Sequence, residues 1–299
     1  MIARLDVFFR PAAPALRLGL VRVAVGFYTL VLLLARSGHL VSVTRLEPAQ
    51  FTPVGVVSWL SAPLPPAVVF ALVGASLLAA LPFVLGYRFA ATGPLFAGLL
   101  LWVTSYRNSY GMIFHTENLP VLTCVVLALS PSADALSLDA RAGRAGRALS
   151  GRSYGGPLRL LAMMTAVTYV IAGVTKLRNS GADWVTGDTL RYYVALDNAR
   201  KIELGDSHSP LVAPLLRHAR LFVPMAAVSL VVELGAPLAL VHRRVAQLWA
   251  LAAWGFHVGV LALMWIFFPY PLLGFAYLPF VRIERLGPVR RVLRRLRGR

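Results

Sequence analysis

Apolar residues along the chain gather in long runs without the two-residue alternation of a half-buried strand. The runs lie at about residues 18–36, 66–87, 89–106, 111–130, 157–177, 219–241, 245–266 and 268–282. A bilayer core of about 30 Å needs roughly 20 such residues per helix. The last run is short and contains Pro269, Pro271 and Pro279. The pattern therefore predicts about six to eight transmembrane helices.

Composition agrees with a membrane location. Of the 299 residues, 58% are hydrophobic and 14% are charged, and the mean hydropathy is +0.70, more apolar than a soluble core of this length needs. In lipid the backbone must satisfy its own hydrogen bonds, which long unalternating runs do only as helices. We expect an all-α integral membrane protein, a polytopic helical bundle, with a transmembrane domain at 1–282 and a basic tail at 283–299.

Two features of the first half refine this expectation. The first apolar run contains Arg22 and is followed by further spans, so it is expected to be a retained helix and not a signal peptide. Cys124 is the one cysteine, which excludes an internal disulfide and a cysteine-clustered metal site.

The net charge of +18 is unevenly distributed. Residues 139–159 hold five arginines against Asp139, and the chain after Val281 holds eight arginines against Glu284, whereas residues 178–218 balance five basic with five acidic residues. Arginine-rich segments lie in the cytoplasm by the positive-inside rule. The pattern predicts the cytoplasmic (inner) membrane of a bacterium, with both termini cytoplasmic. The charge indicates topology, and no nucleic-acid partner is expected.

Segments between the spans carry weaker signals. Residues 37–65 and 178–218 are expected on the outer face, and Gly187 to Glu203 is either an amphipathic helix, with Leu190, Tyr193, Val194 and Leu196 on one side, or an irregular loop. Residues 139–159 resemble a flexible cytoplasmic linker. The tail at 289–297 is either a topology anchor or an amphipathic segment on the anionic inner leaflet.

Ionisable residues inside the apolar runs are candidates for function, because each costs of order 2.5–3.5 kcal/mol at bilayer depth. They are Arg22, His115, Glu117, Glu233 and His257, with Asn118 on nearly the same helix face as His115. Structural interpretations compete with functional ones. Glu233 could simply pair with Arg22, and His257 could be an interhelical hydrogen-bond donor.

Lys176 is a further candidate, since only Lys176 and Lys201 among the 30 basic residues are lysines. A desolvated amine can lose its proton and act as a base or nucleophile, whereas arginine stays charged. The alternative is a lysine that snorkels to the interface from a helix end. No histidine pair has metal-binding helical spacing and no phosphate loop or catalytic triad order occurs, so no metal is expected.

The segment Ala172-Gly173-Val174-Thr175-Lys176-Leu177, followed by Asp183-Trp184-Val185 and Gly187, is similar to the Ala-Gly-x-x-Lys-Leu, Asp-Trp and Gly positions of a known family. That family is the horizontally transferred transmembrane (HTTM) domain family, related to the membrane part of vitamin K-dependent γ-carboxylases. Further similar positions cover nearly the whole chain: Arg22 with Gly26, His115 leading to Pro131 and Leu138-Asp139, Glu233 in Val-Val-Glu-Leu-Gly, and His257 after Phe256.

The resemblance implies a carboxylase-like chemistry. Lys176 would be the base that deprotonates a reduced naphthoquinone (vitamin K or menaquinone hydroquinone), oxygen would convert the quinone into its epoxide, and carbon dioxide would add to a glutamate carbanion. It assigns catalytic roles to Lys176 and His115, and His257 is the third candidate catalytic residue. Supporting residues are Glu117, Asn118, Asp183, Trp184, Gly187, Glu233 and Arg22.

Three function classes follow. The first is a γ-glutamyl carboxylase-like lyase or quinone-epoxidising enzyme that acts on a peptide or protein on the outer face. The second is a non-enzymatic membrane factor for maturation or export of a secreted peptide. The third, a small-solute transporter, is disfavoured because the chain has no inverted repeat.

Overall fold

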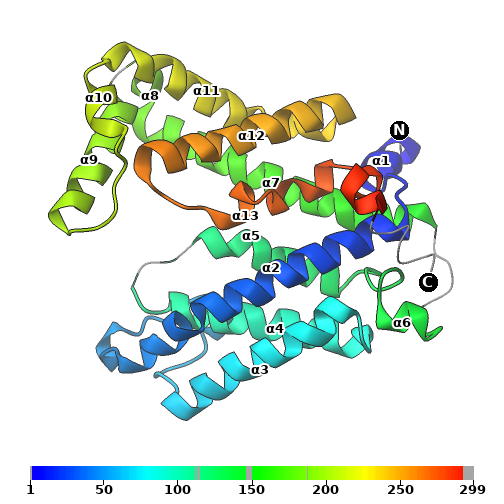
Figure 1. The fold of residues 1–299 in the computed structure, drawn as a ribbon. Helices are drawn as coiled ribbons and strands as arrows, with labels where there is room; N and C mark the ends of the chain where they lie inside the picture. Colours follow the sequence, from blue (N-terminus) through cyan, green and yellow to red (C-terminus); the bar gives the residue numbers. More distant parts are fainter. Residues whose placement is uncertain (1, 112, 114, 146–149, 187, 292–299) are drawn as a thin grey trace. The chain divides into compact units, whose positions relative to one another are not determined.

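The protein is helical throughout the part of the chain that the structure, a computed structural model, describes (Figure 1). These residues are 2–111, 113, 115–145, 150–186 and 188–291. They contain no strand, and five of their helices are long and apolar enough to cross a membrane. The five are α2 (Ala15–Ser42), α3 (Pro66–Leu85), α4 (Phe89–Asn108), α7 (Gly151–Ser180) and α12 (Arg243–Met264). The expectation of an all-α integral membrane protein is confirmed.

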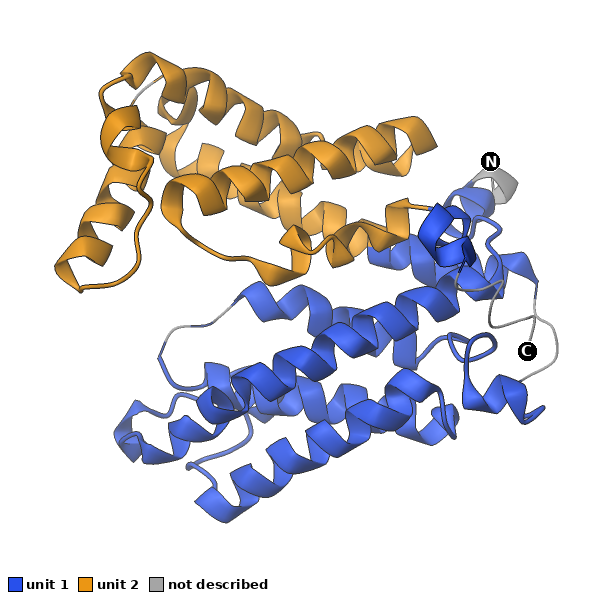
Figure 2. Ribbon diagram, in the orientation of Figure 1, with its two compact units in different colours: residues 1–161, 282–299 blue, residues 162–281 orange. Residues whose placement is uncertain are grey.

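The chain divides into two compact units (Figure 2). Unit 1 comprises residues 1–161 and 282–299, and unit 2 comprises residues 162–281. The boundary falls inside α7, so the first turns of this helix belong to unit 1 and the remainder to unit 2.

Unit 1 is built on α2, α3, α4 and α5 (Asn118–Ala128), in which helices that follow one another along the chain pack together. Leu18, Phe83, Phe96 and Leu100 are fully buried in its core. The unit also contains the short elements α1 (Ile2–Phe9), α6 (Leu138–Arg141) and the 3₁₀ turn η8 (Ile283–Arg285). Arg17 of α2 donates to the Glu284 carboxylate at 2.8 Å, which holds η8 against α2.

The expected loop at 37–65 is shorter than predicted, because α2 continues to Ser42. It contains the 3₁₀ turns η1 (Val43–Arg45), η2 (Pro48–Gln50) and η3 (Gly55–Val57). Val43, Val57 and Leu60 of this segment pack in a buried cluster with Val69, Tyr106 and Tyr110, whereas Trp59 is 72% exposed.

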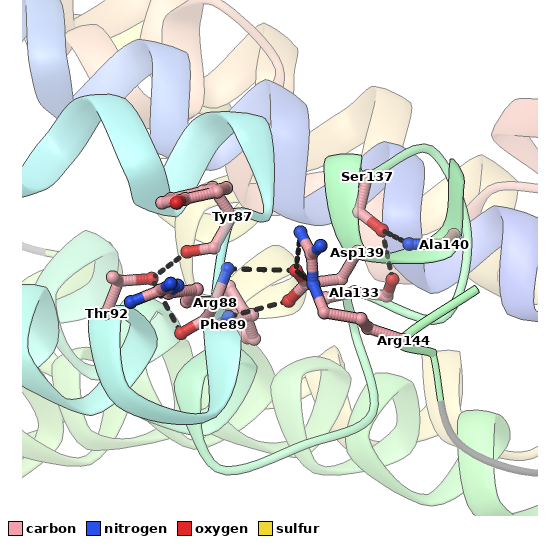
Figure 3. A network of polar contacts seen from close by, with 9 residues as sticks. All are labelled: Tyr87, Arg88, Phe89, Thr92, Ala133, Ser137, Asp139, Ala140 and Arg144. Carbon is pink, nitrogen blue, oxygen red and sulfur yellow. Dashed lines mark hydrogen bonds and ion pairs between the residues drawn. The ribbon is translucent and has the colours of Figure 1, made fainter. Parts of the chain in front are cut away.

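Asp139 caps the beginning of α4 (Figure 3). Its carboxylate accepts the N–H groups of Arg88 at 2.9 Å and Phe89 at 2.7 Å, and Arg144 donates to it at 3.0 Å. Burial alone would raise the pKa of this carboxyl, but these three donors outweigh burial and lower the pKa. Burial of the carboxylate is thus compensated by hydrogen bonds to the positive end of the α4 dipole.

This capping corrects the prediction of a flexible linker at 139–159. Its first residues form part of α6 and its last residues begin α7 at Gly151. Ala13 donates its N–H to the Gly151 carbonyl at 2.9 Å, which fixes the start of α7. Residues 146–149 lie outside the described part of the chain.

Unit 2 holds the rest of α7 and the helices that pack around it. The α-helices are α8 (Asp183–Thr186), α9 (Thr189–Glu203), α10 (Val212–Leu216), α11 (Phe222–Leu234), α12 and α13 (Pro269–Leu272). The 3₁₀ turns are η5 (Ala219–Leu221), η6 (Ala236–Leu240) and η7 (Phe275–Phe280). Helix α11 packs against both α8 and α12, and each of these three helices contributes one side chain that contacts Lys176 of α7.

Three predicted spans are shorter or broken. Helix α5 has 11 residues, about 16 Å at 1.5 Å per residue, and α11 ends at Leu234, where η6 with Pro237 follows. The run at 268–282 is divided into α13 and η7 around Gly274 at φ 83°. Proline removes a helical donor and a positive φ ends a helix, so apolar length alone overestimated these helices.

The predicted amphipathic helix at 187–203 is present as α9, and Gly187 lies outside the described residues. Half of the predicted apolar side is packed: Val194 is buried and Leu190 packs against the cluster that contains it, whereas Tyr193 and Leu196 are 51% and 67% exposed. Asn198 is the other buried residue of the helix. Asn198 donates to the Leu263 carbonyl at 2.9 Å and accepts the Ser209 N–H at 2.9 Å, so a polar residue, not Leu196, fixes the orientation of α9.

The prediction for the basic tail reaches beyond the described chain, since residues 292–299 lie outside it. It therefore stays a prediction.

Candidate functional site

Lys176 and Glu233 form a pair within unit 2. Lys176 Nζ donates to Glu233 Oε1, and the Glu233 side chain is buried at 2% exposure, whereas that of Lys176 is 21% exposed. A backbone feature allows this contact. A Cβ added to Gly173 would lie 2.9 Å from Leu234 Cδ2 and 3.0 Å from Glu233 Cβ. Glycine therefore lets α7 and α11 approach closely, one helical turn before Lys176.

Two aromatic rings cover the ammonium group. Lys176 Nζ lies 5.0 Å from the ring centroid of Trp184 and 5.3 Å from that of Phe256, distances at which ring faces attract a cation. Trp184 is buried and is held in place by the hydrogen bond from its Nε1 to Ser229 Oγ at 3.2 Å. Ser229 is four residues before Glu233, so one face of α11 positions both the carboxylate and the ring.

Two buried polar atoms near Lys176 have no hydrogen-bond partner among the described residues. They are Glu233 Oε2 and His257 Nδ1. An unsatisfied buried polar atom costs about 1–3 kcal/mol, and such atoms are uncommon in folded proteins. Both atoms lie in unit 2, and one is on the carboxylate that accepts from Lys176.

His257 is connected to two tyrosines that sequence reasoning missed. His257 Nε2 and the Tyr169 hydroxyl are 2.9 Å apart, and the hydroxyls of Tyr169 and Tyr277 are 2.6 Å apart. Tyr169, Gly173 and Lys176 lie at helical spacing on one face of α7, a signal that could have identified Tyr169. Tyr277 lies in the proline-broken η7, where no periodicity points to it.

Trp184 and Phe256 lie where their rings stabilise a positive charge on Lys176. In low-dielectric surroundings such a charge is otherwise strongly disfavoured.

Other predicted site residues lie elsewhere or serve the backbone. His115, Glu117 and Asn118 belong to unit 1, in η4 (His115–Glu117) and at the start of α5. Glu117 Oε1 lies 3.6 Å from Nε of Arg36. Asp183 is exposed at the start of α8, and its carbonyl accepts the Thr189 hydroxyl at 2.9 Å.

The expected pairing of Arg22 with Glu233 is wrong. Arg22 is fully buried in unit 1 and donates to the carbonyls of Phe83, Val84, Ser132 and Leu136 at 2.7, 2.6, 3.1 and 2.6 Å. Glu233 takes Lys176 as its partner instead. Backbone carbonyls at helix ends are unpaired acceptors, and a planar guanidinium reaches several of them at once, which opposite charge alone did not predict.

The fold and this pair define an all-α integral membrane protein with a buried lysine–glutamate site. The HTTM domain matches residues 9–283, most of the chain. The protein belongs to the HTTM domain family, which is related to the membrane part of vitamin K-dependent carboxylases. No curated protein and no solved structure matches the chain.

Proposed function

We propose that the protein is a membrane enzyme of the carboxylase-like type, in which Lys176, paired with Glu233, is the base that accepts a proton from a reduced naphthoquinone. The observation that carries this proposal is the buried pair itself, with an oxygen of Glu233 left free to accept a hydrogen bond. A lone structural ion pair has no need of an unsatisfied oxygen.

The residues present fit such a cofactor. A hydroquinone has an aromatic ring and two hydroxyl groups, and unit 2 offers aromatic rings around Lys176 together with a free buried oxygen and a free buried ring nitrogen. When bound, a reduced naphthoquinone supplies, through its reaction with oxygen, the driving force for removing a proton from a glutamate side chain before carbon dioxide adds. A lipid-soluble quinone would enter from the bilayer, and a peptide or protein would be the carboxylated substrate.

In this proposal the protein's own groups bind, orient and move protons. Glu233 orients the Lys176 amine through Oε1 and contacts the ligand through Oε2. Trp184 and Phe256 stabilise the ammonium that results from proton uptake. The apolar surroundings exclude water, so that the amine has little competing solvation.

Orientation is part of the proposal. Arginine-rich segments on the cytoplasmic side put both termini there and put Lys176 in the opposite half of the membrane. Reporter fusions at the two termini and at Ser207 test this orientation. Cytoplasmic signals from the termini and an external signal from Ser207 are expected, and the reverse pattern would contradict it.

The test uses purified protein in lipid nanodiscs with reduced menaquinone, bicarbonate and oxygen. Wild-type protein is expected to consume oxygen and form quinone epoxide, which is measured by mass spectrometry. Lys176→Met should lower the rate by at least about 100-fold, the low end of what a positioned base contributes. Lys201→Met is the matched control because it replaces the other lysine, and it should retain activity. Equal rates in all three proteins would overturn the role of Lys176.

A second candidate function is a non-enzymatic membrane factor, favoured by the exposed apolar residues of the 189–204 segment. Tyr192, Leu196 and Leu204 are 67%, 67% and 70% exposed, and exposed apolar groups mark contact surfaces. No epoxide from folded wild-type protein, combined with peptide binding lost on Leu196→Asp, would support this function over the enzymatic one.

A further inference from the structure

The hydrogen-bond chain Tyr277–Tyr169–His257 joins three segments of unit 2. Tyr277 comes from η7, Tyr169 from α7 and His257 from α12. Both tyrosines are buried, and the three groups are linked by contacts of 2.6 and 2.9 Å. Since each unsatisfied polar atom of a buried chain costs free energy, the protons in it have few favourable arrangements.

The arrangement with fewest unsatisfied atoms has one direction. Tyr277 donates to Tyr169, Tyr169 donates to His257 Nε2, and the ring proton then stays on Nδ1. In the opposite direction the Tyr277 hydroxyl would need a different acceptor for its proton. Among the described residues, the Tyr277 hydroxyl has no hydrogen-bonding partner other than Tyr169. That direction therefore leaves a second buried group unsatisfied, at about 1–3 kcal/mol. The chain favours a His257 ring with its proton on Nδ1.

This donor lies in the same packed set of side chains as the Lys176–Glu233 pair. The Phe256 ring contacts both the Lys176 ammonium, at 5.3 Å, and the His257 ring, at 5.2 Å. On the other side, Tyr169 packs edge-on against Trp249 with ring centroids 5.0 Å apart.

Trp249 extends this connection to the acidic partner of the pair. Its Nε1 donates at 2.8 Å to the carbonyl of Val232, the residue before Glu233. One buried donor, His257 Nδ1–H, and one buried acceptor, Glu233 Oε2, thus face no partner within a common aromatic framework.

We propose that His257 binds the ligand of this site by donating Nδ1–H to a ligand oxygen, while Glu233 Oε2 accepts from a ligand hydroxyl. Tyr169 and Tyr277 are positioning residues that keep the proton on Nδ1. The ligand class is a ring compound with two oxygens, at least one of them a hydroxyl. This inference rests on the proposed function for the reaction, but the tautomer and the binding contacts can be measured without turnover.

The first experiment determines the tautomer. Protein labelled with ¹⁵N-histidine is reconstituted in lipid, and its ring nitrogens are observed by solid-state NMR near pH 7, with His257→Gln used to assign the signal. A protonated Nδ1 and an unprotonated Nε2 are expected in wild type and in Tyr277→Phe, because Tyr169 still donates there. Tyr169→Phe should shift the proton to Nε2 at least in part. A proton on Nε2 in wild type, or no change in Tyr169→Phe, overturns the inference.

The second experiment tests binding without oxygen. Short-chain reduced naphthoquinone is added anaerobically to the labelled protein. A shift of the His257 Nδ1 signal is expected in wild type, with at least a 10-fold weaker Kd in Tyr169→Phe and in Glu233→Gln. Tyr154→Phe is the matched control, since this buried tyrosine in unit 1 donates to Asp134 at 3.0 Å, and its Kd should not change.

The two experiments separate the inference from the proposed function. A protonated Nδ1 that responds to the ligand, in a protein that forms no epoxide, would contradict the enzymatic proposal and leave the binding inference intact. An active enzyme whose His257 signal does not respond to the ligand would overturn the inference alone.

Discussion

Arg22 in unit 1 and Lys176 in unit 2 are both cations in helices long enough to span a membrane, Arg22 fully buried and Lys176 partly buried, and their hydrogen-bonding partners are of opposite kinds. The Arg22 guanidinium reaches four carbonyl groups from two segments of unit 1 and lies 5.5 Å from the Phe89 ring centroid. These carbonyls belong to the end of α3 and to the segment after α5. The arginine therefore joins helix ends that would otherwise expose unpaired acceptors to hydrocarbon.

Within the described part of the chain, Lys176 has Glu233 as its hydrogen-bonding partner, and one buried oxygen of Glu233 has no partner there. Nearby His257 also keeps an unused nitrogen. Both cations interrupt apolar runs of the sequence, so an ionisable residue in such a run does not by itself distinguish a structural role from a functional one. The two cations differ in whether the polar atoms around them are all hydrogen-bonded. Where all of them are paired, the hydrogen bonds stabilise the fold, and where one is unpaired, it is available to a ligand.

The largest expected effect on stability is that of Arg22→Met. It removes the donors of four hydrogen bonds, and each buried acceptor left alone costs about 1–3 kcal/mol, so a loss of more than about 4 kcal/mol is expected. SDS-titrated unfolding in mixed micelles measures it. Arg22→Lys should recover only part of the loss, because an ammonium does not span the same carbonyls.

Arg36→Met is the matched control for this prediction. Arg36 lies on the same helix with its side chain 40% exposed, 3.6 Å from Glu117, and a partly exposed pair contributes at most about 1 kcal/mol. An Arg22 variant as stable as the Arg36 variant would show that the carbonyl contacts are not structural.

A smaller effect is expected at Asp139, the other buried charge of unit 1 that is fully hydrogen-bonded. Asp139→Ala should destabilise by about 1–2 kcal/mol, the range for a lost helix cap. Because the folded pKa of Asp139 lies below its ordinary value of 3.8, its contribution is present above about pH 4 and is lost as the pH falls through the folded pKa.

Thermal unfolding between pH 7 and pH 3 checks this dependence. The difference between wild type and Asp139→Ala should shrink toward the acid end. Asp206→Ala, an exposed acidic control, should follow wild type throughout. A difference that stays constant with pH would show that the capping carboxylate is not ionised when it acts.

Much of the fold followed from the apolar runs, because hydrocarbon leaves helices as the available solution. The runs at 66–87, 89–106 and 245–266 became α3, α4 and α12 nearly unchanged. Where prolines and positive-φ glycines interrupt a run, as at Gly274, the backbone cannot continue as one helix and the run is divided into shorter elements. The place of Asn198 in the buried face of α9 was also missed, since it depends on partners elsewhere in the chain, Leu263 and Ser209.

The candidate site was only partly predictable. Lys176, Glu233, His257 and Trp184 were identified because charged or motif residues stand out in an apolar sequence. The pairing was not, because Glu233 meets Lys176 through the close helix approach at Gly173, a three-dimensional property. No sequence pattern pointed to Tyr277, since it joins the site through a single hydroxyl contact with Tyr169.

The smallest expected effect on stability is that of the double variant Lys176→Met/Glu233→Leu. If the pair serves a ligand, replacing both charges with apolar groups of similar size should change the free energy of unfolding by less than about 1 kcal/mol, or even increase stability, because two buried charges and an unsatisfied oxygen disappear together. Each single variant should be less stable than the double variant, since it leaves the other ionisable group buried alone. A double-mutant cycle by SDS-titrated unfolding measures the coupling. A double variant as unstable as Arg22→Met would place the pair with Arg22 among the structural charges and remove the contrast between the two units.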